Sequence, residues 1–120
     1  MAKILLIDDD ENIHEIVSLF LGADGHDVIG ALDGPRGIDI AGSEIPDLIM
    51  LDLAMPGMDG PEVYRVLKAN PATADIPVLI FTVHDPEDLP AEICDLGCAG
   101  YLNKPVNGEN LRNTINAALS

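Results

Sequence analysis

The sequence is poor in aromatic residues and in cysteine. Aromatic side chains make up 3% of its 120 residues and tryptophan is absent, although 48% of the residues are hydrophobic. A core of this composition has to be mainly aliphatic. The two cysteines, Cys94 and Cys98, are four positions apart with no histidine pair or second cysteine pair nearby. This spacing excludes the usual zinc and disulfide patterns, so we expect small apolar or surface thiols.

The chain also lacks long hydrophobic runs and a basic segment. No apolar stretch approaches the roughly 20 residues of a membrane span, and the N-terminus has no signal-peptide pattern. We therefore expect a soluble, cytoplasmic protein without a membrane partner. Six basic residues stand against 21 acidic ones, which gives a formal net charge of −15. Such a chain repels nucleic-acid phosphates, so we predict no direct nucleic-acid partner.

Short apolar runs alternate with amphipathic stretches along the whole chain, and the length favours one domain spanning 1–120. A helix near residue 89 or 90 is expected to start late, because Pro86 and Pro90 fall where it should begin. The alternation predicts an α/β fold, a doubly wound five-stranded parallel sheet with helices on both faces. The other predicted elements are strands at 3–7, 27–31, 48–51, 77–82 and 100–102, and helices at 12–22, 34–43, 61–70 and from 107.

Two helices carry more local predictions. Asn12 followed by Glu15 resembles a capping box at the start of the first helix. In the helix at 61–70, the pattern places Val63, Val66 and Leu67 on one inward face.

Polar residues follow four of the predicted strands. Asp8 and Asp9 end the first strand, Asp52 follows the third, Thr82 ends the fourth, and Lys104 lies just past the fifth. The carboxyl ends of parallel strands share one edge, and in the order 2-1-3-4-5 the switch point lies between the first and third strands. The three acids would line that crevice with the threonine and lysine on its flank. Taken singly, each residue reads as a helix cap, a strand end or a surface charge. Their joint placement favours a site.

Three neighbouring carboxylates need a compensating charge. Two unit charges 4 Å apart repel by roughly 4 kcal/mol at an effective dielectric constant of 20. Protonation of an acid, a bound cation or Lys104 has to offset this repulsion. As the cation, Mg²⁺ suits a cluster of oxygen ligands, with Mn²⁺ as the alternative. A carboxylate nucleophile beside a divalent cation, a hydroxyl group and a lysine matches phosphoryl transfer to an aspartate.

At these residues the chain resembles the response-regulator receiver domains of two-component signalling, and the resemblance covers its whole length. The motifs that carry it are Ile7-Asp8-Asp9, the run from Leu51 to Gly60, and the run from Gly100 to Pro105. The resemblance implies a flavodoxin-like fold with strand order 2-1-3-4-5. It also implies a cytoplasmic signalling domain whose partners are a histidine kinase or phosphotransfer protein and an output protein.

The resemblance assigns a role to each site residue. Asp52 would accept a phosphoryl group from phosphohistidine in a Mg²⁺-dependent reaction. Asp9 would bind the Mg²⁺ directly and Asp8 largely through water. The backbone carbonyl of Ala54 would be a further ligand beside Asp52.

The same resemblance implies a switch. Lys104 would pair with a phosphoryl oxygen, aimed by a cis peptide bond to Pro105. Thr82 would hydrogen-bond the phosphoryl group and draw its loop inward, while Tyr101 swings toward the core. The face formed by the fourth helix, fifth strand and last helix would then act on the output partner, whose identity the sequence leaves open.

Three positions depart from the family's pattern or tune its rates. Ala54 and His84 stand two residues beyond Asp52 and Thr82, where the family tunes dephosphorylation. Val83 stands where the family usually has a small residue, so we expect narrower access to the phosphoacceptor.

The residues leave two other classes of function open. A phosphatase of the haloacid dehalogenase type would use Asp52 as nucleophile but needs a second Asp where Ala54 stands. A phosphorylation-independent interaction domain has no need of the acid cluster. We expect no enzymatic activity other than assistance of its own phosphorylation and slow autodephosphorylation. His14 and His26 are predicted to face solvent.

Overall fold

The computed structural model describes residues 2–53, 60–82, 100–103 and 108–119, and for residues 82, 100, 101 and 103 it describes the backbone alone. The predicted helix near residue 89 or 90 lies outside these ranges. The elements follow in the order β1 (Lys3–Ile7), α1 (Glu11–Ala23), β2 (Asp27–Ala31), α2 (Gly34–Glu44), β3 (Leu48–Leu51), α3 (Gly60–Ala69), β4 (Val78–Thr82), β5 (Gly100–Asn103) and α5 (Gly108–Leu119).

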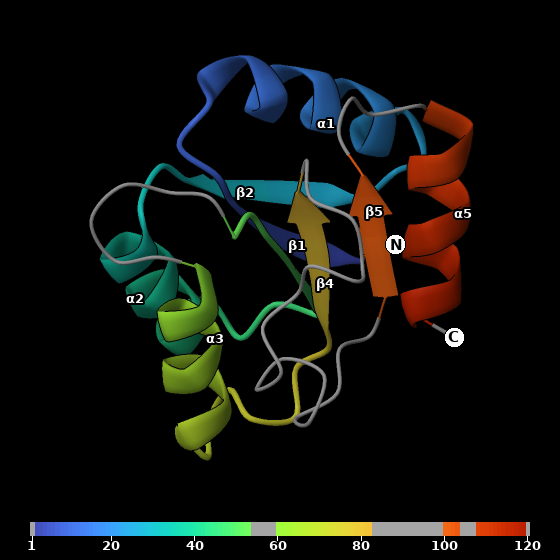
Figure 1. Ribbon diagram of the computed structural model, residues 1–120. Coiled ribbons are helices and arrows are strands. Elements are labelled where there is room, and N and C mark those ends of the chain that lie inside the picture. Colours follow the sequence, from blue (N-terminus) through green and yellow to red (C-terminus); the bar gives the residue numbers. More distant parts are fainter. Residues whose placement is uncertain (1, 54–59, 83–99, 104–107, 120) are drawn as a thin grey trace.

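The strands form one parallel sheet in the order β2-β1-β3-β4-β5. Helices α1 and α5 lie on one side of the sheet, and α2 and α3 lie on the other (Figure 1). Parallel strands need crossover connections, and helices in those crossovers cover both faces of the sheet. The predicted α/β architecture, a flavodoxin-like parallel sheet with helices, is confirmed.

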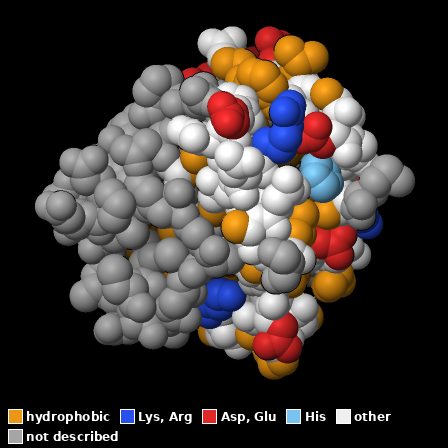
Figure 2. All heavy atoms as spheres, turned by 90° about the vertical axis from the view of Figure 1, so that its right-hand side faces the viewer, with side chains coloured by type: hydrophobic (Ala, Val, Ile, Leu, Met, Phe, Trp, Pro, Cys, Tyr) orange, Lys and Arg blue, Asp and Glu red, His pale blue; other side chains and the backbone are white. Residues whose placement is uncertain are grey.

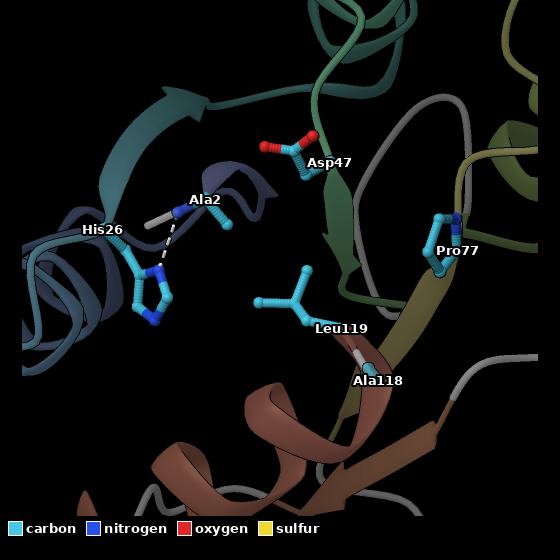
Figure 3. A pocket seen from close by; sticks show the side chains of 6 residues that line it. All are labelled: Ala2, His26, Asp47, Pro77, Ala118 and Leu119. Carbon is cyan, nitrogen blue, oxygen red and sulfur yellow. Dashed lines mark hydrogen bonds between the residues drawn. The ribbon is translucent and has the colours of Figure 1, made fainter.

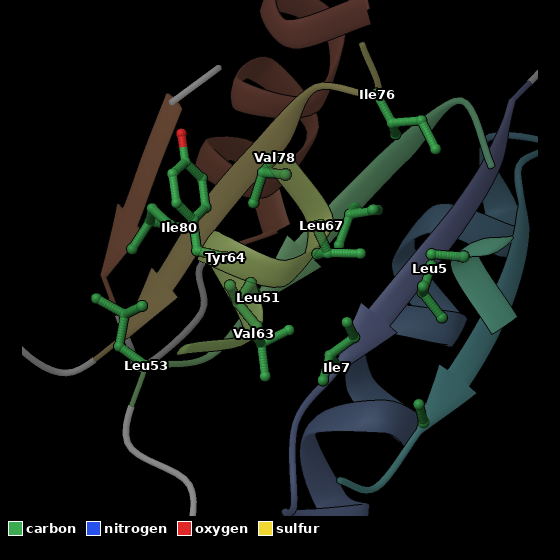
Figure 4. Close-up of a cluster of buried hydrophobic side chains, with 13 residues drawn as sticks. Leu5, Ile7, Leu51, Leu53, Val63, Tyr64, Leu67, Ile76, Val78 and Ile80 are labelled. Carbon is green, nitrogen blue, oxygen red and sulfur yellow. The ribbon is translucent and has the colours of Figure 1, made fainter. Parts of the chain in front are cut away.

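Two apolar clusters fill the space between the sheet and the helices. One joins the sheet to α1 and α5, and the other joins it to α2 and α3 (Figure 4). Most members are aliphatic, as the composition predicts, but Tyr64 and Phe81 are among the largest fully buried side chains. The predicted inward position of Val66 is wrong: its side chain is 37% exposed, and Tyr64 is fully buried. The inward stripe of α3 runs through Gly60, Val63, Tyr64 and Leu67, so the apolar period starts one residue before the predicted helix.

Helix α1 begins earlier than its sequence pattern predicts. Asp10 is the N-cap residue, and its Oδ1 atom accepts a hydrogen bond from the Asn12 backbone N–H at 2.9 Å. The prediction that Asn12 caps the helix is therefore wrong. A carboxylate at this position also interacts favourably with the helix dipole.

Lys68 stabilises the connection between α3 and β4 through hydrogen bonds. Its ammonium group donates hydrogen bonds to the carbonyl oxygens of Ala74 at 3.1 Å and Ile76 at 3.0 Å, and lies 5.8 Å from the centre of the Tyr64 ring. Burial lowers the pKa of the Lys68 ammonium from its ordinary value, and the nearby Asp75 carboxylate opposes this shift. These contacts hold the turn that leads into β4.

Strain is stored at the end of α2. Ile45 has φ 45° and ψ 66°, a left-handed conformation, and its side chain is 49% exposed. A β-branched residue is costly there, whereas glycine is the preferred residue in a left-handed helix cap.

We expect Ile45→Gly to stabilise the protein by about 1 kcal/mol, because relief of the strain exceeds the entropy that glycine adds to the unfolded chain. The corresponding rise in Tm is roughly 4 °C, measured by thermal unfolding. Ile45→Val keeps the branched Cβ atom and should give no such gain. A glycine variant that melts at or below the wild-type temperature would contradict the prediction.

No described helix is both long enough and apolar enough to cross a membrane. On the face that contains α5, the basic side chains within the described residues stand singly among acidic and uncharged ones (Figure 2).

Candidate functional site

The pairing of β1 with β3 places two acids side by side. Ile7 is in register with Leu51, and the next residues along the two strands are Asp8 and Asp52. The Asp52 backbone N–H donates to the Ile7 carbonyl oxygen at 3.0 Å, and the Asp8 N–H donates to that of Ala31 at 3.1 Å. Both acids are thus held in place by backbone bonds to the neighbouring strand.

Asp9 completes a cluster of three carboxylates. One carboxylate oxygen from each of Asp8, Asp9 and Asp52 lies within 4.8 Å of the others. Asp8 is fully buried, Asp52 is 3% exposed, and Asp9 is exposed. The structure therefore brings these three predicted site residues together at the carboxyl edge of the sheet, with one side open to solvent.

The surroundings of Asp8 fit a bound cation. Its Oδ1 atom accepts a hydrogen bond from the Asp10 backbone N–H at 2.9 Å. Its Oδ2 atom is buried and accepts no hydrogen bond from the residues that the structure describes. Like charges grouped in a partly buried place repel strongly, and a divalent cation compensates them.

The donor set favours a hard metal ion. All three side chains offer carboxylate oxygens, the ligands that suit Mg²⁺ and Mn²⁺. The predicted backbone ligand, Ala54, lies outside the described residues. The three described acids could hold such an ion.

The predicted switch residues lie on the two strands beyond β3. Thr82 is the last residue of β4, where its backbone pairs in register with Asn103 of β5. Tyr101 pairs with Ile80 in the same ladder. Both therefore belong to the same half of the sheet, while the positions of their side chains are not described. The other predicted residues, Val83, His84 and Lys104, lie outside the described ranges.

Gly60 lies close to the backbone of Asp52, the candidate phosphoacceptor. Its N–H donates to the Leu53 carbonyl oxygen at 3.3 Å. A Cβ atom at this position would overlap the Cα atom of Leu53 and lie 2.7 Å from the carbonyl oxygen of Asp52. The sequence identifies Gly60 only as the end of the motif that begins at Leu51, whereas in the structure the start of α3 packs directly on the Asp52 backbone.

His14 belongs to the site as well, so the prediction that it faces solvent is wrong. Its ring is half-buried, and Nε2 lies 2.7 Å from the backbone carbonyl oxygen of Asp8. Two signals could have found it. Position 14 lies one helical turn after the cap residue Asp10, and Gly30, inside a predicted strand, indicates a close approach by another group.

A separate hollow lies at the opposite edge of the sheet. It has a volume of about 430 Å³, and residues that precede β1, β3 and β4 contribute to its wall (Figure 3). His26 lines it and accepts a hydrogen bond on Nδ1 from the Ala2 N–H at 3.1 Å, so this histidine is also less exposed than predicted. The hollow is not part of the acid cluster. Its lining residues are Ala2, His26, Asp47, Pro77, Ala118 and Leu119.

The chain is similar to known proteins over nearly its whole length. The family model for the response regulator receiver domain matches residues 4–116. The chain is 38% identical over 120 residues to protein PilH of Pseudomonas aeruginosa, covering 100% of this chain and 99% of that protein. It is 41% identical over 119 residues to the DNA-binding dual master transcriptional regulator RpaA of Synechocystis sp., covering 99% of this chain and 49% of that regulator.

The fold is also similar to solved structures. The chemotaxis response regulator CheY4 of Vibrio cholerae superposes with a TM-score of 0.91 at 32% sequence identity, and the match covers 99% of each chain.

Proposed function

The chain belongs to the response regulator receiver domain family of two-component signalling, and on that basis we propose that Asp52 accepts a phosphoryl group from a phosphohistidine. The observation that carries the proposal is the approach of the Asp8, Asp9 and Asp52 carboxylates to within 4.8 Å at the ends of β1 and β3. The assignment of all of 1–120 to this one domain stays a prediction.

In the proposed reaction, a carboxylate oxygen of Asp52 attacks the phosphorus atom. A P–O bond forms as the P–N bond to the donor imidazole breaks, and the imidazole leaves with the electron pair of that bond. A bound Mg²⁺ would neutralise negative charge on the transferring oxygens. Asp8 and Asp9, with the Ala54 carbonyl, would hold that ion beside Asp52. The buried setting of Asp52 positions its carboxylate and limits competing water.

We propose that phosphorylation is read by a switch on the far half of the sheet. Lys104 would pair with the phosphoryl group, Thr82 would hydrogen-bond it, and Tyr101 would turn inward. The surface acting on the output partner would include β5 and α5, together with the segment at 83–99. Response regulators interact with kinases and output proteins, and this chain would meet both in the cytoplasm.

We further propose that the domain is a phosphoacceptor rather than a turnover enzyme. It would assist its own phosphorylation and slowly hydrolyse the product. The rates would depend on Ala54, Val83 and His84. Sustained hydrolysis of a phosphate ester, over many cycles per molecule, would instead support the phosphatase alternative.

The test is intact-protein mass spectrometry after incubation with acetyl phosphate or a phosphorylated kinase. We expect one phosphoryl increment in the presence of Mg²⁺, none when the metal is chelated, and loss of the increment in hydroxylamine, which cleaves acyl phosphates. Absence of any increment with several donors and Mg²⁺ would contradict the proposed function.

A further inference from the structure

We propose that His14 is a positioning residue for the metal-binding acids: its ring braces the loop that carries Asp8 and Asp9. The inference rests on the proposed function, because it assigns His14 a part in cation binding. It goes beyond that function because none of the proposed metal-binding or phosphoryl-binding residues lies in α1.

The brace acts on the backbone of Asp8. The Nε2 atom of His14 donates to the Asp8 carbonyl oxygen at 2.7 Å. On the other side, the Asp8 N–H donates to Ala31 of β2 at 3.1 Å, and its Oδ1 accepts from the Asp10 N–H at 2.9 Å. Asp8 is therefore held through its N–H, its carbonyl and one carboxylate oxygen.

The residue on the other side of Asp9 is anchored too. Asp10 caps α1, and its carbonyl oxygen accepts from the N–H groups of Ile13 at 3.2 Å and His14 at 3.4 Å. His14 thus contacts Asp10 through its backbone and Asp8 through its ring. Asp9, which is exposed, is therefore the single residue between two fixed neighbours, Asp8 and Asp10. The orientation of its side chain depends on the positions of both.

Gly30 provides the space for the ring. A Cβ atom at Gly30 would lie 2.6 Å from Nδ1 and 3.0 Å from Cε1 of His14. The ring would have to move away from β2, and that movement would lengthen its bond to the Asp8 carbonyl. The absence of a side chain at position 30 and the presence of a donor at position 14 therefore belong to one arrangement.

The brace opposes a specific force. With no cation bound, the carboxylates of Asp8, Asp9 and Asp52 repel one another, which favours a loop that opens outward. A loop already held in the binding geometry needs less rearrangement when the cation arrives, and such preorganisation raises affinity. Contacts that orient ligand residues without touching the metal typically change metal affinity by about tenfold or more.

The experiment is isothermal titration of the full chain with Mg²⁺. We expect His14→Leu, which keeps bulk but lacks a donor, to bind Mg²⁺ about tenfold more weakly. His14→Gln, which keeps an N–H donor of similar reach, should restore most of the affinity. The control is His26→Leu, which removes a similar ring bonded to a backbone group at the opposite edge of the sheet and should bind Mg²⁺ normally. Thermal unfolding in chelator verifies that each variant is folded.

Gly30→Ala tests the same brace from β2. It should weaken Mg²⁺ binding in the wild-type background and have little further effect once His14 is replaced by alanine. Unchanged affinity in folded His14→Leu, or no recovery in folded His14→Gln, would overturn the inference while leaving the proposed function intact. A wild-type chain that binds no Mg²⁺ would instead contradict the proposed function itself.

Discussion

Asp52→Asn is expected to abolish phosphoryl incorporation while the fold is retained. Asparagine has nearly the same shape as aspartate, and the backbone bond from residue 52 to the Ile7 carbonyl does not involve the side chain. The substitution removes the carboxylate nucleophile, so no acyl phosphate can form at this position. Intact-protein mass spectrometry with Mg²⁺ and a phosphodonor measures the loss, and circular dichroism verifies the fold.

The matched control is Asp47→Asn, because the two aspartates flank the same short strand. Asp47 precedes β3 at the amino edge, where its Oδ2 accepts a hydrogen bond from the Lys3 N–H at 2.8 Å. An asparagine oxygen can accept the same bond, so this variant should be phosphorylated like the wild type. A normal phosphoryl increment on Asp52→Asn would show that another residue is the acceptor and would refute the assignment.

Gly60→Ala is expected to produce the largest loss of stability among the substitutions considered. The added methyl group would overlap the Leu53 Cα atom and press on the Asp52 carbonyl oxygen. Because these are backbone atoms, a side-chain rotation cannot relieve the contact. Overpacking typically costs about 1–3 kcal/mol, and occasionally more. We expect the upper part of that range and a Tm lowered by roughly 10 °C, measured by thermal unfolding.

The same substitution should slow phosphorylation at temperatures where the variant is folded, since it shifts the backbone that carries the acceptor. Gly42→Ala in α2 is the control, because a Cβ atom there meets nothing within 4 Å. That variant should be as stable as the wild type or slightly more stable, since alanine favours a helix. Equal melting temperatures for Gly60→Ala and the wild type would contradict the close packing described at this position.

Much of the architecture follows from the sequence alone. Apolar runs that alternate with amphipathic segments are local patterns, and they predict a parallel α/β sheet because only crossover helices can cover both of its faces. The acids at the ends of the first and third strands could be assigned to one edge for the same reason. The family resemblance rests on short runs such as Ile7-Asp8-Asp9, which are also local.

The tertiary structure decided what depends on contacts between distant segments. The tight grouping of Asp8, Asp9 and Asp52 comes from the register of β1 against β3, which no single segment contains. Helix periodicity wrongly predicted Val66 on the inner face of α3, whereas packing against the sheet buries Tyr64.

The supports of the site were likewise invisible to pattern reasoning. His14 reads as a polar helix residue until β2 brings Gly30 beneath its ring and β1 brings the Asp8 carbonyl within 2.7 Å of Nε2. Gly60 is only the end of a motif in the sequence, and its close packing on the Asp52 backbone is visible only in the structure. The sequence by itself therefore determined the fold class and the acids of the proposed site, because both are expressed in local periodicity and strand ends. Only the tertiary structure decided which side chains hold those acids in place, because hydrogen bonds and close packing form between elements far apart in the chain.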